Sequence, residues 1–220
     1  RNPALGVSAG RIPERERHRY LSAPEVQSLA TACGDQGDVV TILAYTGLRW
    51  SELVGLRVKD IDLVARRLYV RRAAPEVEGR IVIGPPKTRA GIRTVPLPPV
   101  VVDSRKTRIG GRAPDEPAIA SPNGAMLRSN NWRRHTRWNK ALKKTNLAPL
   151  TIHDLRHTFI VRSALRLYEQ GGDVERGLPV LSIYVGHAKV VDTYWYLTGI
   201  PELMAIAAER FHRYAQGEPT

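Results

Sequence analysis

Two tyrosines that follow a histidine raise the first chemical question about this sequence. In "VGHAKVVDTYWYLTG", residues 185–199, Tyr194 and Tyr196 flank a tryptophan a short distance after His187. The aromatic rings could simply pack, or one phenol could attack the phosphorus of a phosphodiester. On a helix, residues two apart point roughly 200° apart around the axis, so only one of the two tyrosines can face a substrate.

A second group of polar residues lies in "HDLRH", residues 153–157. His153 and Arg156 are three apart and share a helix face, where the free N–H groups of a helix N-terminus favour an anion. His153 and His157 have the spacing of two zinc ligands, but no glutamate follows the first histidine and no third ligand is indicated. An anion site is therefore favoured over zinc, although a solvated polar face would be the simpler interpretation of this motif alone.

Two further cations follow turn signals. Arg49, in "TGLRWSEL", comes just after Gly47, and its planar guanidinium fits two phosphate oxygens, with Glu52 three residues on to orient it. Lys87, in "PPKTRAGIRTVPL", is predicted to lie in or beside a hairpin turn, from which it could deliver a charge or a proton. An ordinary surface arginine and an exposed turn lysine are the alternatives for these two motifs alone.

The charge balance indicates a polyanionic partner. The chain of 220 residues has 34 Lys and Arg against 21 Asp and Glu, for a formal net charge of +13. Such a surface attracts nucleic acids or anionic membranes. No apolar run approaches the roughly 20 residues that cross a bilayer, and the sequence does not open on a signal peptide. We therefore expect a nucleic acid rather than a membrane as the partner.

The single cysteine limits the chemistry further. Cys33 excludes a disulfide within the chain and argues against a thiolate metal cluster. Near a predicted helix end, it is expected to be a small buried apolar residue, which is compatible with a reducing cytoplasm.

The elements that position these residues are predicted to be mainly helical. Ser22 and Glu25 form a capping-box pattern at the start of the first helix, and Gly47 suits a left-handed cap after the second. Short β-branched segments separated by Gly or Pro between residues 62 and 97 predict a small antiparallel sheet. Residues 1–20 are polar and basic, which is typical of a linker or arm.

The second half of the chain is predicted to be helical. Residues 128–144 form a strongly basic helix candidate with two tryptophans. Thr151 and Asp154 begin a long helix that stops at Gly171. We expect Pro179 to open a further short helix, and residues 201–216 to form an amphipathic one.

Taken together, the segments resemble a known family. "AYTGLRWSELVGL", "PPKTRAGIRTVPL", "HDLRHTF", "VGH" and "DTYWYLTG" follow the order and approximate spacing of the tyrosine recombinases, the phage-integrase family. The resemblance runs from about residue 20 to the C-terminus. It implies an α+β, mainly helical catalytic domain with a small antiparallel sheet near residues 62–97.

The resemblance also implies a set of site residues. The family pattern of Arg, Lys, His-x-x-Arg, His and Tyr falls on Arg49, Lys87, His153, Arg156, His187 and Tyr196. The tyrosine of the family usually lies nine residues after the histidine of the Gly-His pair. This spacing selects Tyr196, and we expect Tyr194 and Trp195 to pack.

The implied activity is site-specific DNA recombination by an integrase or transposase of a mobile element. Tyr196 would form a 3′-phosphotyrosyl intermediate without a metal or other cofactor. Because the usual pKa of tyrosine is near 10, the phenol needs cationic neighbours. The two arginines would stabilise the charge on the phosphate, the two histidines would hold it or exchange protons, and Lys87 would protonate the leaving 5′ oxygen, as in the family.

The resemblance has implications for organisation and partners. Nothing corresponds to the family's N-terminal helical domain, so we expect a catalytic domain over residues 21–220, preceded by a linker over 1–20. The partners would be double-stranded DNA and further copies of the chain in a tetrameric synapse, with no membrane, at the bacterial nucleoid in the cytoplasm. The chain between Arg156 and His187 is longer than usual in the family, and we expect the extra residues to form a longer loop.

Two segments and the function as a whole have alternatives. The basic helix could be a solvated face or contact DNA, which we favour. The C-terminal helix, with Leu203, Ile206, Ala207 and Phe211, could pack within its own chain or dock on a neighbouring protomer. Against a recombinase stand a type IB topoisomerase, a non-catalytic DNA-binding module, a zinc protein and a structural protein whose aromatic residues merely pack.

Overall fold

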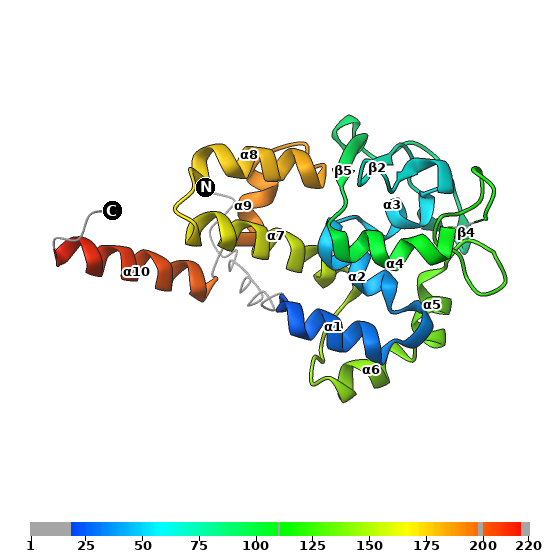
Figure 1. Ribbon diagram of the computed structural model, residues 1–220, viewed down its shortest axis with the longest axis horizontal. Helices are drawn as coiled ribbons and strands as arrows, with labels where there is room; N and C mark the ends of the chain where they lie inside the picture. Colours follow the sequence, from blue (N-terminus) through cyan, green and yellow to red (C-terminus); the bar gives the residue numbers. More distant parts are fainter. Residues whose placement is uncertain (1–18, 110, 198–199, 217–220) are drawn as a thin grey trace, which may run out of the picture.

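Ten α-helices and two small antiparallel sheets make up the part of the chain that the computed structural model describes, residues 19–109, 111–197 and 200–216 (Figure 1). The helices are α1 (Ala23–Ala32), α2 (Asp38–Thr46), α3 (Trp50–Gly55), α4 (Pro99–Ile109), α5 (Ser129–His135), α6 (Trp138–Lys144), α7 (Ile152–Glu169), α8 (Val174–Val185), α9 (Val191–Leu197) and α10 (Pro201–Ala215). Short 3₁₀ turns occur at η1 (Gly34–Gln36), η2 (Val58–Asp60) and η3 (Arg89–Gly91). The predicted arm over residues 1–20 lies almost entirely outside the described residues.

The sheets fall where the sequence predicts them. Strands β1 (Ile61–Asp62), β2 (Arg67–Val70) and β5 (Arg93–Pro96) form one antiparallel sheet in the order β1-β2-β5. Between β2 and β5 the chain makes a separate hairpin of β3 (Glu76–Val77) and β4 (Arg80–Ile81). The long connection after β4 leads into β5, which is one of the two edge strands of the larger sheet.

Side-chain caps start two of the helices, α1 and α7. At α1, the backbone N–H of Ser22 donates to the Glu25 carboxylate at 2.7 Å. At α7, the backbone N–H of Thr151 donates to the Asp154 carboxylate at 2.7 Å. Both confirm the capping boxes expected from the sequence, and each satisfies N–H groups that a helix start leaves open.

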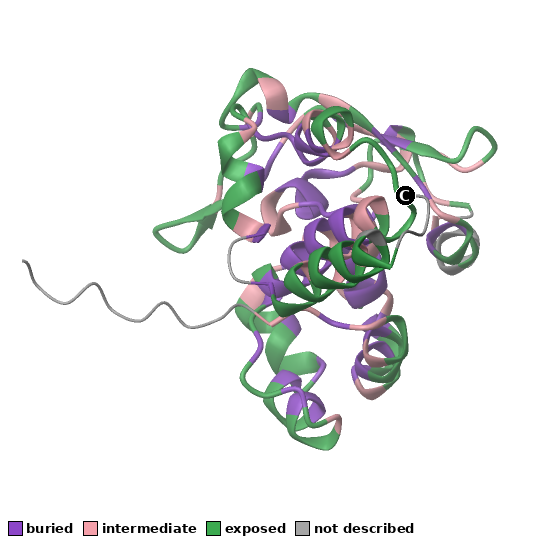
Figure 2. Ribbon diagram, turned by 90° about the vertical axis from the view of Figure 1, so that its left-hand side faces the viewer, coloured by how far each residue is buried: buried purple, intermediate pink, exposed green. Residues whose placement is uncertain are grey.

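The core surrounds α7, which packs against α2, α8, α9 and α10. Its inward face carries Leu155, Ile160, Val161 and Ala164, all fully buried. Burial of side chains this size stabilises the fold by about 1.5–3 kcal/mol for each of the larger ones. Figure 2 shows the buried residues gathered on the inward sides of the helices, with exposed residues outside. Cys33 is buried at the end of α1, as expected.

The predicted basic helix is two helices. α5 and α6 meet at Arg137, whose φ of 50° lies in the left-handed region. Trp132 and Trp138 are 1% and 3% exposed, with ring centroids 5.2 Å apart. In one continuous helix these residues would point about 120° apart, so the break lets both tryptophans enter the core. The tryptophans are thus core residues, while the arginines and lysines around them are exposed.

The prediction that Pro179 opens a helix is also wrong. α8 begins at Val174, and the Asp173 side chain caps it by accepting from the Arg176 N–H at 3.1 Å. Pro179 lies inside the helix, where its missing N–H leaves the carbonyl of the exposed residue Glu175 to water. The expected longer loop before this point is therefore mostly the first turns of α8.

The last helix packs on its own chain along one side only. Leu203 and Ile206 lie half-buried against the core around α7, whereas Met204 and Phe211 are 72% and 70% exposed. Figure 1 shows α10 extending away from the rest of the fold. None of the helices in the described residues is long and apolar enough to cross a membrane.

Candidate active site

Five of the six predicted site residues meet where α2, α7, α8 and α9 converge. Arg49 follows the end of α2, His153 and Arg156 lie in the first turns of α7, and the remaining two, His187 and Tyr196, lie after α8 and on α9. The contacts below connect all five.

Arg49 is held by the turn that ends α2. Gly47 caps that helix with a φ of 63°, which confirms the predicted left-handed cap. The Arg49 guanidinium donates to the Glu52 carboxylate at 2.8 Å and to the Gly186 carbonyl at 3.3 Å. Glu52 thus orients Arg49, as expected, and 38% of the arginine side chain remains exposed to meet a ligand.

Glu52 is the buried centre of this arrangement. Its side chain is 2% exposed and also accepts from Arg93 on β5, at 3.0 and 3.1 Å. Burial alone would raise the pKa of Glu52, but the hydrogen bonds and charges of Arg93 and Arg49 together bring it below its usual value. The carboxylate is therefore ionised at neutral pH and offsets part of the positive charge of the arginines.

Arg156 is 1% exposed and is fixed by carbonyl oxygens. Its guanidinium donates to the Gly47 carbonyl at the end of α2 and to the Val185 carbonyl at the end of α8, the latter at 2.8 Å. Burial, followed by the repulsion of Arg49, lowers the pKa of Arg156 to about 10. Arg156 is still charged at neutral pH, and the partial negative charge of helix C-termini favours a cation at this place.

His187 is buried beside these cations. Gly186 ends α8 with a φ of 70°, and His187 Nδ1 lies 2.9 Å from the Thr193 hydroxyl. Burial, followed by the charges of Arg156 and Arg49, lowers the pKa of His187 to about 4. At neutral pH the imidazole is therefore uncharged.

Tyr196 lies between imidazole rings. Its ring centroid is 5.6 Å from that of His187 with the planes 20° apart, and 5.3 Å from that of His157. Its hydroxyl is 3.3 Å from Nε2 of His153. Rings packed on both sides leave the phenol little freedom, so its oxygen is held at the edge of the arginine cluster.

The structure corrects the prediction for the neighbouring aromatic residues. Tyr194 and Trp195 are 49% and 42% exposed, whereas Thr193 is fully buried and Tyr196 is half-buried. The face of α9 that meets the core carries Thr193, Tyr196 and Leu197, which are three and four apart. The two tyrosines do point in different directions, but it is Tyr196 that faces the core. Trp195 packs edge-on against the Tyr196 ring, with the centroids 5.6 Å apart.

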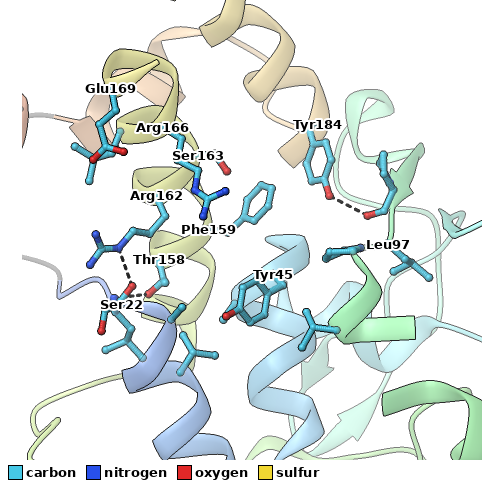
Figure 3. Close-up of a pocket in the computed structure, with 18 residues that line it drawn as sticks. Ser22, Tyr45, Leu97, Thr158, Phe159, Arg162, Ser163, Arg166, Glu169 and Tyr184 are labelled. Carbon is cyan, nitrogen blue, oxygen red and sulfur yellow. Dashed lines mark hydrogen bonds between the residues drawn. The ribbon is translucent and has the colours of Figure 1, made fainter. Parts of the chain in front are cut away.

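A small hollow opens beside the arginines. It has a volume of about 250 Å³ and is lined by Leu48, Trp50, Ser129, Arg133, Ile152, His153 and Arg156. A larger groove of about 740 Å³ lies elsewhere, between α1, α2, α4 and the middle of α7 (Figure 3). That groove has a mainly apolar wall that includes Tyr45, Phe159 and Tyr184, and none of the six predicted residues lines it. The smaller hollow has the charge to hold an anion.

Lys87 is the residue that the structure does not bring to the others. It lies exposed in the connection between β4 and β5, rather than in the turn of the β3–β4 hairpin. Within the described residues, no hydrogen bond or ion pair joins Lys87 to the remaining five.

Sequence reasoning missed Arg93 and gave His157 no place beside Tyr196. Arg93 links β5 to Glu52 and, through Nε, to the Tyr184 carbonyl at 2.6 Å. The alternation of a strand gives the signal, because Arg93 shares a face with the buried Val95. For His157 the helical spacing placed it with His153, and only the packing of α9 on α7 brings it to Tyr196.

No metal cluster is evident in the described ranges. No three His, Cys, Asp or Glu side chains gather there in a way that could hold a metal ion. His153 and His157 therefore have no third such ligand among those residues.

The chain is similar to known proteins over most of its length. The model of the phage integrase family matches residues 17–199. Two proteins named as integrase/recombinase in Sinorhizobium fredii (strain NGR234) are 32% and 30% identical, over 91% and 87% of this chain and 68% and 63% of their own lengths. A protein named as the prophage phiRv2 integrase of Mycobacterium tuberculosis is 28% identical over 74% of this chain and 44% of its own length. The chain thus spans between 44% and 68% of the lengths of these relatives.

Solved structures share the fold. The Tn1549 transposon integrase, in complex with circular intermediate DNA, superposes with a TM-score of 0.67 at 25% identity, over 90% of this chain and 68% of that chain. XerA recombinase gives a TM-score of 0.64 at 25% identity, over 95% and 68%. The mainly helical fold with its small sheets is therefore that of a tyrosine-recombinase catalytic domain, and the chain belongs to the phage integrase family.

Proposed function

We propose that this chain breaks and rejoins DNA in site-specific recombination for a mobile element, with Tyr196 as the nucleophile. The observation that carries the proposal is the position of the Tyr196 hydroxyl, 3.3 Å from His153 and beside a cluster of arginines at a hollow that can hold an anion. The relatives named as integrases and the DNA-bound integrase with the same fold support it.

The chemistry follows from the residues. The Tyr196 oxygen attacks the phosphorus, the bond from phosphorus to the 5′ oxygen breaks, and a 3′-phosphotyrosyl link forms. Arg49 and Arg156 stabilise the negative charge that grows on the non-bridging oxygens. A 5′ hydroxyl of another strand then attacks the link and releases Tyr196, so the bond energy is kept.

Protons move through the histidines and the lysine in this proposal. His153 is placed to accept the phenolic proton. His187, uncharged because of its low pKa, donates a hydrogen bond to the phosphate through Nε2 instead of serving as an acid. Lys87 protonates the leaving 5′ oxygen, which requires the exposed connection after β4 to close over bound DNA.

Double-stranded DNA is the proposed partner. The net charge of +13 and the exposed cations of α5 and α6 suit phosphate contacts. Strand exchange needs cleaved ends from two duplexes, so we also propose that copies of the chain assemble as a tetramer on DNA. The action would take place at the nucleoid in the bacterial cytoplasm.

The test is a covalent adduct. A nicked duplex carrying the ends of the element, or a pool of sequences, is incubated with the protein in EDTA and run on a denaturing gel. We expect an adduct that persists in Tyr194→Phe and disappears in Tyr196→Phe. An adduct that is lost only in Tyr194→Phe would show that Tyr194, and not Tyr196, is the nucleophile. DNA binding with no adduct at all would favour a non-catalytic module.

A further inference from the structure

Tyr20, just before α1, joins the two ends of the described chain. Its hydroxyl donates to the carboxylate of Glu202, in the first turn of α10. The guanidinium of Arg162 lies over the Tyr20 ring, 5.3 Å from its centroid, which is a favourable cation–π distance. A residue ahead of the first helix is thus bonded to the helix that follows the nucleophile-bearing α9.

The backbone beside Tyr20 is anchored on α7. The N–H of Leu21 donates to the Thr158 hydroxyl at 3.1 Å, and Arg162 Nε donates to the Leu21 carbonyl at 2.9 Å. Figure 3 shows Thr158 and Arg162 on α7 with these bonds to the segment that enters α1. Tyr20 therefore has a fixed base from which to hold Glu202.

One buried ring separates Tyr20 from Tyr196. The His157 ring, 5% exposed, has its centroid 6.1 Å from that of Tyr20 and 5.3 Å from that of Tyr196. Close-packed interiors transmit small displacements, since neighbouring side chains have no free volume to absorb them. The His157 ring on α7 thus lies near both tyrosine rings.

We infer that Tyr20 is a positioning residue for the attack by Tyr196. This inference rests on the proposed function. The Tyr20–Glu202 hydrogen bond holds the start of α10 against α7, and Leu197 at the end of α9 packs in the same cluster as Ile200 and Leu203. The His157 ring then contacts the Tyr20 ring as well as the Tyr196 ring, and it keeps the Tyr196 oxygen beside His153 and the arginines. Displacements of about 1 Å in such an arrangement lower rates strongly.

The charge of the acceptor supports this role. The hydrogen bond from Tyr20 lowers the pKa of Glu202, so the carboxylate is ionised at neutral pH. A hydrogen bond from a neutral hydroxyl to an ionised carboxylate is stronger than one between neutral groups.

The experiment uses four variants of the chain. Tyr20→Phe removes only the hydroxyl, Glu202→Ala removes the acceptor, and Glu202→Gln keeps an acceptor oxygen. Tyr69→Phe is the matched control, because Tyr69 lies on β2 and packs against Arg67 and Arg71 at the sheet. For each, four quantities are measured: the adduct rate on the nicked duplex with saturating protein, the affinity for the intact duplex, the midpoint of urea unfolding, and amide hydrogen exchange along the chain.

We expect the adduct rate to fall about fivefold in Tyr20→Phe and Glu202→Ala, with DNA affinity unchanged. The unfolding midpoint should stay close to that of wild type, because α10 packs along one side only and opens locally before the chain unfolds. Exchange should accelerate in α9 and the first turn of α10 but not in α2. Glu202→Gln should retain most of the rate, and Tyr69→Phe all of it. A merely structural role would instead lower the unfolding midpoint and raise exchange throughout the chain.

Three results would each overturn the inference. They are unchanged exchange in α9 of Tyr20→Phe, a normal adduct rate despite faster exchange there, and a fall in rate that only matches a loss of DNA affinity. If the wild-type chain forms no adduct, the proposed function fails, while exchange in α9 still decides whether Tyr20 holds Tyr196.

Discussion

Glu52 and Arg93 form a buried two-pronged ion pair, with Arg93 Nη1 3.1 Å from Glu52 Oε1 and Nη2 3.0 Å from Oε2. The pair fixes β5 to α3. Because Glu52 also binds Arg49, the pair sets the direction of an arginine that the proposed reaction needs at the phosphate. A residue on the sheet therefore helps to orient a residue of the candidate active site.

Arg93→Lys should destabilise the chain and slow adduct formation. Lysine keeps the charge but loses the fork that fits both carboxylate oxygens, which leaves Glu52 partly unpaired in a buried place. We expect a loss of about 2–4 kcal/mol in the free energy of unfolding by urea. Arg128→Lys is the control, since Arg128 pairs with Glu76 at the surface, where such pairs contribute about 1 kcal/mol or less. Equal losses in the two variants would show that the buried pair contributes no more to stability than the surface pair.

Gly47→Ala should destabilise the fold and disturb Arg156, which donates to the Gly47 carbonyl. A Cβ at Gly47 would lie 2.5 Å from the Phe159 ring, and the φ of 63° adds backbone strain. Gly171→Ala is a matched control, because its φ is 67° and no atom lies within 4 Å of its added Cβ. We expect about 1 kcal/mol of destabilisation for Gly171→Ala from strain alone, and at least about 1 kcal/mol more for Gly47→Ala. Thermal unfolding of both variants gives the comparison, and similar midpoints would contradict it.

The free energy of unfolding should decrease as the pH is lowered, partly because of His187. Its pKa is about 4 in the folded chain against an ordinary value of about 6.5, so below pH 6.5 the unfolded state takes up a proton that the folded state refuses. The contribution is present above pH 6.5 and is lost as the pH falls toward 4, by at most about 1.4 kcal/mol per pH unit. Urea unfolding between pH 7 and 5 should show a shallower fall in His187→Gln than in wild type. Parallel curves would mean that His187 does not resist protonation.

Arg133 should contribute to the salt dependence of DNA binding. It lines the hollow with His153 and Arg156, and its side chain is exposed. Loss of one phosphate contact in Arg133→Gln should reduce the slope of log K against log salt by about 0.9. Arg176→Gln is the control, since Arg176 is 90% exposed on α8 and is paired with Asp173. A slope that drops equally in both variants would mean that the effect is one of net charge.

Local signals in the sequence were sufficient for much of the fold. The capping boxes at Ser22 and Thr151 and the left-handed Gly47 each depend on residues within one or two turns, so they were predicted correctly. The same local regularity places His153 and Arg156 on one face of α7. Family spacing selected Tyr196 as the proposed nucleophile, and its hydroxyl beside His153 is compatible with that proposal.

Tertiary packing decided what the sequence could not. The row of Thr193, Tyr196 and Leu197 faces the core only because α9 lies on α7 in one orientation. The break at Arg137 follows from two tryptophans that both have to enter the core, and the role of Arg93 follows from a sheet edge that meets α3 and α8. These are contacts between elements far apart in the chain, which periodicity does not encode.

The arginines of the site are held largely by backbone carbonyl oxygens, those of Gly47, Tyr184, Val185 and Gly186. Every amino acid supplies such an oxygen, so the anchoring places little demand on side-chain identity at those positions. The demand falls on the path of the backbone, which has positive φ at Gly47 and Gly186. Relatives can therefore diverge widely around this site and keep the same arginine geometry, provided that these two turns survive.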